Sequence, residues 1–160
     1  MVRTLGLWAV TVAFTIEGKL LILLQFKYGV GEVTIQLPPG GAGKTDHILT
    51  EQEIIDQSRA VFTDETGFGK GVWRLLRRVN VDDNKYRNEY DDGPLQAHLL
   101  WAEGVEKVEE PKPRSTDLYE LIEVDPSEFQ ELLDSEFLVE ISARLCVFEA
   151  FLAKGILKFS

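Results

Sequence analysis

The sequence has little cysteine, no long apolar run and a shortage of basic residues, and each of these absences excludes a class of protein. Cys146 is the only cysteine among 160 residues, so the sequence provides no pair for an intrachain disulfide. A lone thiol fits a reducing compartment, and we predict a cytoplasmic protein. Apolar runs stay far below the ~18 residues of a membrane span, and the N-terminus lacks a small-residue cleavage site. We therefore predict neither a membrane partner nor a signal peptide.

Acidic residues outnumber basic ones by 27 to 17, which gives a formal net charge of −10. A surface that binds nucleic acid irrespective of sequence needs a basic stripe, so we predict no nucleic-acid partner. The local basic cluster of Arg74, Arg77 and Arg78 leaves room for a small polyanion. Strand periodicity predicts that Arg74 and Arg78 share one face and that Arg77 takes the other.

The residues that are present suffice for one folded domain. Apolar residues make up 44% of the chain, and no linker or repeat divides it, so we predict one domain over residues 1–160. Period-two patterning and turn residues predict strands at 5–15, 19–28, 33–37, 72–79, 95–102 and 118–124. Polar loops are predicted over 81–94 and 103–116. Strands with helices among them predict an α/β fold, with a mixed sheet between helices.

The helix predicted over 51–66 has the clearest limits of any element. Thr50 and Glu53 have the spacing of a capping box, and Gly67 suits the left-handed conformation that ends a helix. Near its C-terminal end the helix carries two adjacent acids, Asp64 and Glu65. The helix dipole is negative there, so the pair lowers stability, and a local cost of this kind points to function.

Two further helices are predicted in the C-terminal part of the chain. Asp125 followed by Pro126 begins a short one, because aspartate is a good N-cap and proline suits the first helical position. A longer one covers 136–153. Helical spacing predicts a core face for it, made of Leu138, Ile141, Leu145, Phe148 and Leu152.

The motif Gly43-Lys44-Thr45 is similar to the end of a phosphate-binding Walker A loop and follows a predicted strand. The first glycine of that loop would fall at Pro38, which has no N–H to donate. The helix would also have to begin at Lys44, well before the capping box. We therefore predict an ordinary loop at this position.

The segment Phe62 to Phe68, FTDETGF, resembles the second half of the Nudix hydrolase signature, U-x-E-E-x-G-U, where U is a bulky apolar residue. Residues 20–41 are similar to the strand, hairpin and strand that lead into that family's Pro-Gly-Gly turn, in the branch that acts on ADP-ribose and nucleotide sugars. The signature's preceding Arg-Glu pair falls on Ala60 and Val61.

The resemblance implies a Nudix-type α/β/α sandwich and a hydrolase that cleaves a nucleoside diphosphate linked to another group, with Mg²⁺ or Mn²⁺. Asp64 and Glu65 would bind the metal, and Glu65 would also be catalytic. The general base would come from the polar loop, where Glu109 and Glu110 are the candidates. The residues assigned to the substrate are Gly40, Gly41, Glu53 and Arg74.

Two alternatives stay open. Three carboxylates at i, i+3 and i+4 could organise several metal ions, and Val61 removes the first of them. The second hypothesis is therefore a Nudix-fold protein that binds a nucleotide or a partner without hydrolysis. A third is an interaction protein that uses its acidic surface. A homodimer is compatible with each of them.

Overall fold

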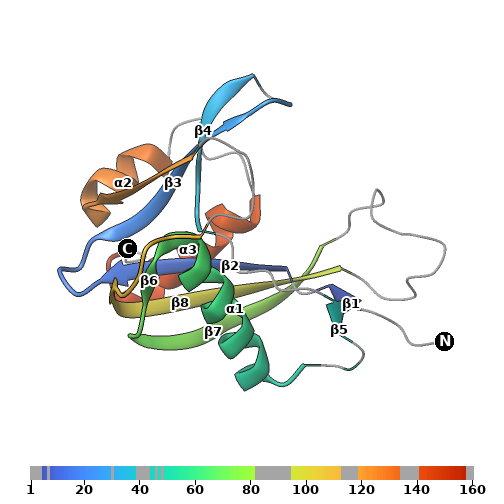
Figure 1. The fold of residues 1–160 in the computed structure, drawn as a ribbon. Coiled ribbons are helices and arrows are strands. Elements are labelled where there is room, and N and C mark those ends of the chain that lie inside the picture. The colour runs from blue at the N-terminus through green and yellow to red at the C-terminus, as the bar shows by residue number, and fades with distance from the viewer. Residues whose placement is uncertain are drawn as a thin grey trace.

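The structure is a computed structural model, and it describes residues 5–6, 8–29, 31–38, 44–45, 47, 49–81, 95–112, 119–133 and 141–157. Its strands are β1 (Leu5–Gly6), β2 (Trp8–Thr15), β3 (Leu20–Lys27), β4 (Glu32–Gln36), β5 (Lys44–Thr45), β6 (Phe68–Gly69), β7 (Val72–Val81), β8 (Leu95–Lys107) and β9 (Tyr119–Val124). Its helices are α1 (Glu51–Thr66), α2 (Pro126–Leu133) and α3 (Ile141–Lys154) (Figure 1). Within the described ranges, no helix is long and apolar enough to cross a membrane.

A mixed sheet forms the middle layer. Strands β4, β3, β2, β8 and β6 follow one another across it, with β7 also paired to β8 and β9 also paired to β3. The β2–β8 pair is parallel, and the other pairs of this sheet are antiparallel. The short strands β1 and β5 form a separate pair. This is the predicted mixed sheet of an α/β fold.

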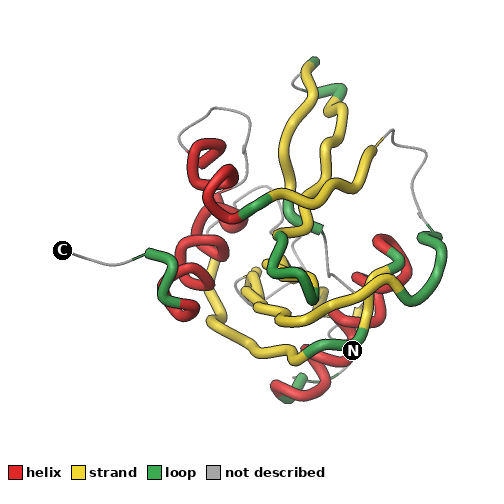
Figure 2. Tube along the Cα trace, turned by 90° about the vertical axis from the view of Figure 1, so that its left-hand side faces the viewer, coloured by secondary structure: helices red, strands yellow, loops and turns green. Residues whose placement is uncertain are grey.

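Strand β2 is buried on both faces, because helices cover the sheet on two sides (Figure 2). Val10, Val12 and Phe14 face a core that includes residues of α2 and α3. Ala9 and Ala13 face a second core, which includes residues of α1. The sheet therefore separates two hydrophobic cores, and α1 lies on the face opposite α2 and α3.

The predicted polar loop over 103–116 is wrong at its start, because β8 continues to Lys107. Glu103 pairs with Val72 of β7, and Glu106 pairs with Gly69 of β6. Both carboxylates lie in ion pairs, Glu103 with Lys154 and Glu106 with Lys70. These partners compensate the charges, so an acidic sequence is compatible with a strand here. The other predicted polar loop, over 81–94, lies outside the described residues apart from Val81, which ends β7.

The predicted faces of the arginine cluster are also wrong. Leu75 pairs with Leu100 and Arg77 pairs with Leu99, so the strand holds one extra residue in a bulge. The bulge turns Arg77 to the same face as Arg74. Arg77 bonds there to Glu149 of α3 at 2.6 Å, and the Arg74 guanidinium lies 5.3 Å from the centre of the Trp101 ring.

Helix α3 packs through a different face from the one predicted. Of the residues predicted for the core face, Phe148 is 41% exposed, Leu145 is partly buried against the core, and Leu138 lies outside the described residues. The buried residues of α3 are Ala143, Cys146, Val147, Ala150 and Phe151. Small side chains let the helix approach the sheet closely. The Sγ atom of Cys146 shows this, because it lies 3.5 Å from the carbonyl oxygen of Val10 and 3.4 Å from that of Leu100. Almost every residue of α3 is apolar or small, so spacing alone could not select the face.

Candidate active site at the C-terminal end of helix α1

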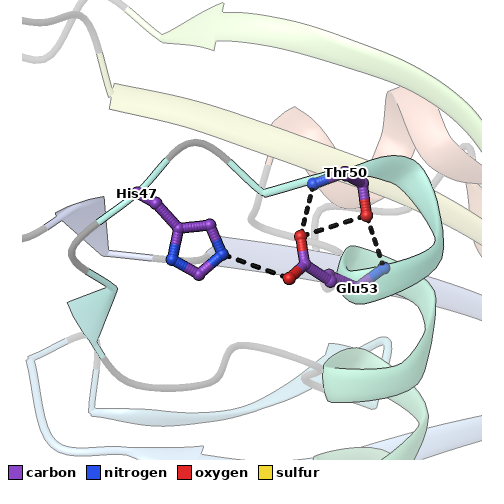
Figure 3. A network of polar contacts seen from close by, with 3 residues as sticks. All are labelled: His47, Thr50 and Glu53. Atoms are coloured by element: carbon purple, nitrogen blue, oxygen red, sulfur yellow. Dashed lines mark hydrogen bonds and ion pairs between the residues drawn. The ribbon is translucent and has the colours of Figure 1, made fainter.

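The N-terminal end of α1 is the predicted capping box (Figure 3). The N–H of Glu53 donates to the Thr50 hydroxyl at 3.3 Å, and the N–H of Thr50 donates to the Glu53 carboxylate at 2.8 Å. His47 lies in the preceding loop, with its Nε2 atom 3.1 Å from Oε1 of Glu53. The pKa of Glu53 is lowered, first by the hydrogen bond from the Thr50 backbone and then by His47. Glu53 therefore fastens this loop to the start of the helix.

Glu53 does not lie near the acidic pair of Asp64 and Glu65. Twelve residues separate it from Glu65, which corresponds to ~18 Å along a helix that rises ~1.5 Å per residue. The structure therefore places this predicted substrate residue at the opposite end of α1 from Asp64 and Glu65. Its carboxylate contacts the His47 ring and both the backbone N–H and the hydroxyl of Thr50 (Figure 3), and these contacts account for its position without a ligand.

The C-terminal end of α1 carries Asp64 and Glu65, both half-buried. The helix ends as predicted at Gly67, which has a left-handed φ of 76° and donates its N–H to the carbonyl of Thr63 at 2.8 Å. A helix C-terminus concentrates negative partial charge, and two carboxylates add to it. This end of α1 is therefore suited to a cation.

The chain after β8 folds over this helix end. Gly67 accepts hydrogen bonds through its carbonyl from the N–H groups of Val108 and Glu109, at 2.8 and 3.2 Å. The N–H of Lys112 donates to the carbonyl of Asp64 at 2.5 Å. Carbonyls in the last turn of a helix have no partner within the helix, so this segment supplies hydrogen-bond donors that the helix lacks.

Tyr119 reaches the same helix end from β9. Its hydroxyl donates to the backbone carbonyl of Glu65 at 3.1 Å. The pKa of Tyr119 is raised, first by burial and then by the charge of Glu65. Sequence reasoning missed this residue, because 54 positions separate it from Glu65 and no local pattern links the two.

The two predicted candidates for the general base differ in their surroundings. The backbone N–H of Glu109 is bonded to Gly67, and its carboxylate lies 3.3 Å from Nζ of Lys112. The Glu110 side chain is 86% exposed and pairs with Lys107 at 2.9 Å. Of the two, only Glu109 donates its own N–H to the helix end, at the carbonyl of Gly67.

Val61 occupies the position where a third carboxylate would complete the acidic face, and it is 5% exposed. Among the residues that the structure describes, no three carboxylate, histidine or cysteine side chains come together as a metal site. The described part of the chain therefore presents a pair of carboxylates at the end of α1 and no larger acidic cluster.

Arg74, another predicted substrate residue, does not lie at this end of α1. Trp73 packs on Phe62 of α1, with ring centres 5.1 Å apart, whereas the next residue, Arg74, stacks on Trp101 on the opposite face of the sheet. The structure thus separates Arg74 from the acidic pair. Gly40 and Gly41 lie outside the described residues.

No family model and no curated protein matches this sequence. Solved structures do match it. An ADP compounds hydrolase superposes with a TM-score of 0.67 at 14% identity, over 95% of this chain and 76% of the other. A Nudix hydrolase from Nitrosomonas europaea gives 0.59 at 13% identity, over 98% and 97% of the two chains. A MutT structure, from work on Aliivibrio salmonicida and Vibrio cholerae, gives 0.59 at 8% identity, over 92% and 98%. The chain therefore has the fold of the Nudix hydrolases.

Proposed function

We propose that this protein hydrolyses the diphosphate bond of a nucleoside diphosphate linked to another group, with the end of α1 as its active site. The observation that carries the proposal is the acidic pair, which lies in the last turn of a capped helix in a Nudix fold, separated by one residue from the left-handed Gly67. An ADP compound is the first substrate to test, because a structural neighbour is described as a hydrolase of such compounds.

The donor set suits one divalent ion better than a cluster of ions. Asp64 and Glu65 offer hard oxygen ligands at the negative end of a helix, and Mg²⁺ is commonly held by one or two carboxylates together with water and substrate phosphates. When bound, Mg²⁺ or Mn²⁺ would neutralise charge on the diphosphate and favour ionisation of a water molecule.

The side chains supply the remaining functions. Glu109 is the general base of our proposal and accepts the proton of the attacking water on its carboxylate, which requires its ion pair with Lys112 to open. Lys112 is then available to a phosphate oxygen. Gly40 and Gly41 keep their predicted role, in which a backbone without side chains approaches the diphosphate closely.

A second function, binding without hydrolysis, is favoured by Val61. A buried valine replaces the carboxylate that would share a helical face with the acidic pair. Adjacent helical positions diverge by about 100°, so Asp64 and Glu65 form a looser cation site than three carboxylates at i, i+3 and i+4 would. With this second function, the protein would keep a nucleotide pocket and would not hydrolyse the bound nucleotide.

Hydrolysis assays distinguish the two functions. The purified protein is incubated with Mg²⁺ or Mn²⁺ and a panel of nucleoside diphosphate compounds that includes ADP-ribose, and released products are measured. Glu65→Gln removes a charge at the site, and Glu51→Gln removes one from the exposed first turn of the same helix. Turnover that only Glu65→Gln abolishes supports hydrolysis. Nucleotide binding without any turnover supports the binding function instead.

A further inference from the structure

We propose that Tyr119 is a positioning residue for Glu65, and that its hydroxyl holds the last turn of α1 in the conformation that presents this carboxylate to a cation. The inference rests on the proposed function for its consequence in catalysis. Its structural part concerns one hydrogen bond, from Tyr119 Oη to the backbone oxygen of Glu65, at 3.1 Å.

Three backbone carbonyls in the last turn of α1 accept hydrogen bonds from three different residues. The carbonyl of Thr63 accepts from Gly67 within the helix terminus, and the carbonyl of Asp64 accepts from Lys112. The carbonyl of Glu65 accepts from Tyr119, the first residue of β9, which lies 54 positions further along the chain. The two acidic residues are therefore anchored separately, one by the segment after β8 and the other by β9. A last turn without such partners frays, and its side chains then sample many orientations.

Tyr119 is itself firmly held. It is the first residue of β9 and pairs with Gln25 of β3, in a ladder that continues to the pair of Leu20 and Val124. Its side chain is half-buried, so the ring keeps its place when the hydroxyl is removed. The hydroxyl thus fixes the backbone of Glu65 relative to β9, although α1 and β9 are not adjacent in sequence.

Tyr119→Phe tests the inference, because it deletes the hydroxyl and keeps the ring. Tyr28→Phe is the matched control, since Tyr28 is 79% exposed on the β3–β4 hairpin. The first measurement is the NMR signal of the Glu65 backbone carbonyl, which reports the hydrogen bond without metal or substrate. The second is the affinity for Mn²⁺, from the signal of free Mn²⁺ in electron paramagnetic resonance. The third is the separation of kcat from KM.

For Tyr119→Phe we expect the Glu65 carbonyl signal to shift, Mn²⁺ to bind about fivefold more weakly, and kcat to fall by a similar factor with an unchanged KM. Tyr28→Phe should change none of these. A Glu65 signal that is the same in Tyr119→Phe and the original protein overturns the inference, as does an unchanged Mn²⁺ affinity. If the original protein binds no Mn²⁺, the proposed function fails separately, and the Glu65 signal alone decides the role of Tyr119.

Discussion

The carbonyl oxygen of Glu109 occupies the space that a side chain at Gly67 would need. A Cβ atom built on Gly67 would lie under 3.0 Å from that oxygen and 3.2 Å from the nitrogen of Pro111. Gly67 is therefore required for two reasons, its left-handed φ of 76° and the close passage of the segment that follows β8. This packing is what brings Glu109 to the end of α1.

Gly67→Ala should destabilise the protein by about 2–5 kcal/mol, because left-handed strain adds to a forced shift of the 108–112 segment. Gly18→Ala is the control, since Gly18 has a similar φ of 78° and nothing within 4 Å of a Cβ. It should cost about 1–2 kcal/mol. Urea unfolding measures both. Equal losses for the two variants would show that the close approach of Glu109 is unimportant.

Val61→Glu would restore the i, i+3, i+4 set of carboxylates with Asp64 and Glu65. The site is only 5% exposed, so without divalent ions we expect a loss of more than about 2 kcal/mol from burying a charge. Mg²⁺ should offset this loss by ~2.7 kcal/mol at a concentration 100 times the Kd. Val61→Gln should show a similar loss and a smaller recovery, because only Asp64 and Glu65 then offer carboxylates to the ion. Thermal unfolding with and without Mg²⁺ tests this, and equal responses of the two variants would contradict a metal site beside Val61.

Glu109→Gln and Glu110→Gln separate the two candidates for the general base. For Glu109→Gln we expect kcat to fall by about 10²–10⁴, the contribution of a positioned base, while substrate affinity changes little. Glu110→Gln should retain nearly full activity, because this side chain is 86% exposed and paired with Lys107. The comparison is a steady-state assay on the substrate that the panel identifies. A fall in kcat confined to Glu110→Gln would reverse our assignment.

The capping box predicts a dependence of stability on pH. The pKa of Glu53 in the folded protein lies below its ordinary value of 4.5. The contribution of Glu53 to the free energy of unfolding is therefore complete above pH 4.5. It is lost as the pH falls through the lower folded-state pKa. Glu53→Gln should remove this part of the acid sensitivity, whereas Glu32→Gln, at an exposed position at the start of β4, should not. Urea midpoints from about pH 6 to about pH 3 give the comparison. Identical slopes for Glu53→Gln and the original protein would refute the role of Glu53.

The sequence predicted local features well where short-range chemistry decides them. Thr50, Glu53 and Gly67 set the limits of α1 because a cap depends on residues within one turn of the helix end. The same holds for Pro126, which begins α2 as expected. The resemblance to the Nudix signature also predicted the fold, and the solved structures confirm it.

Features that depend on tertiary contacts were not predictable. The bulge after Leu75 reverses the face of Arg77, and a pattern of alternating residues contains no sign of an extra residue in a strand. The last part of β8, from Glu103 to Lys107, contains two glutamates. Lysines that are distant in the chain form ion pairs with them, which makes the acidic segment compatible with a sheet. The contact of Tyr119 with Glu65 exists only because β9 pairs with β3.

The central claim is that the end of α1 is the metal site of a hydrolase, and locating Mn²⁺ by anomalous X-ray diffraction tests it most directly. Crystals soaked in Mn²⁺ with a non-hydrolysable ADP compound should show an anomalous peak beside the carboxylates of Asp64 and Glu65. Crystals of Glu65→Gln should lack it. A Mn²⁺ peak elsewhere in the protein, or none beside this pair at saturating Mn²⁺, would contradict the account.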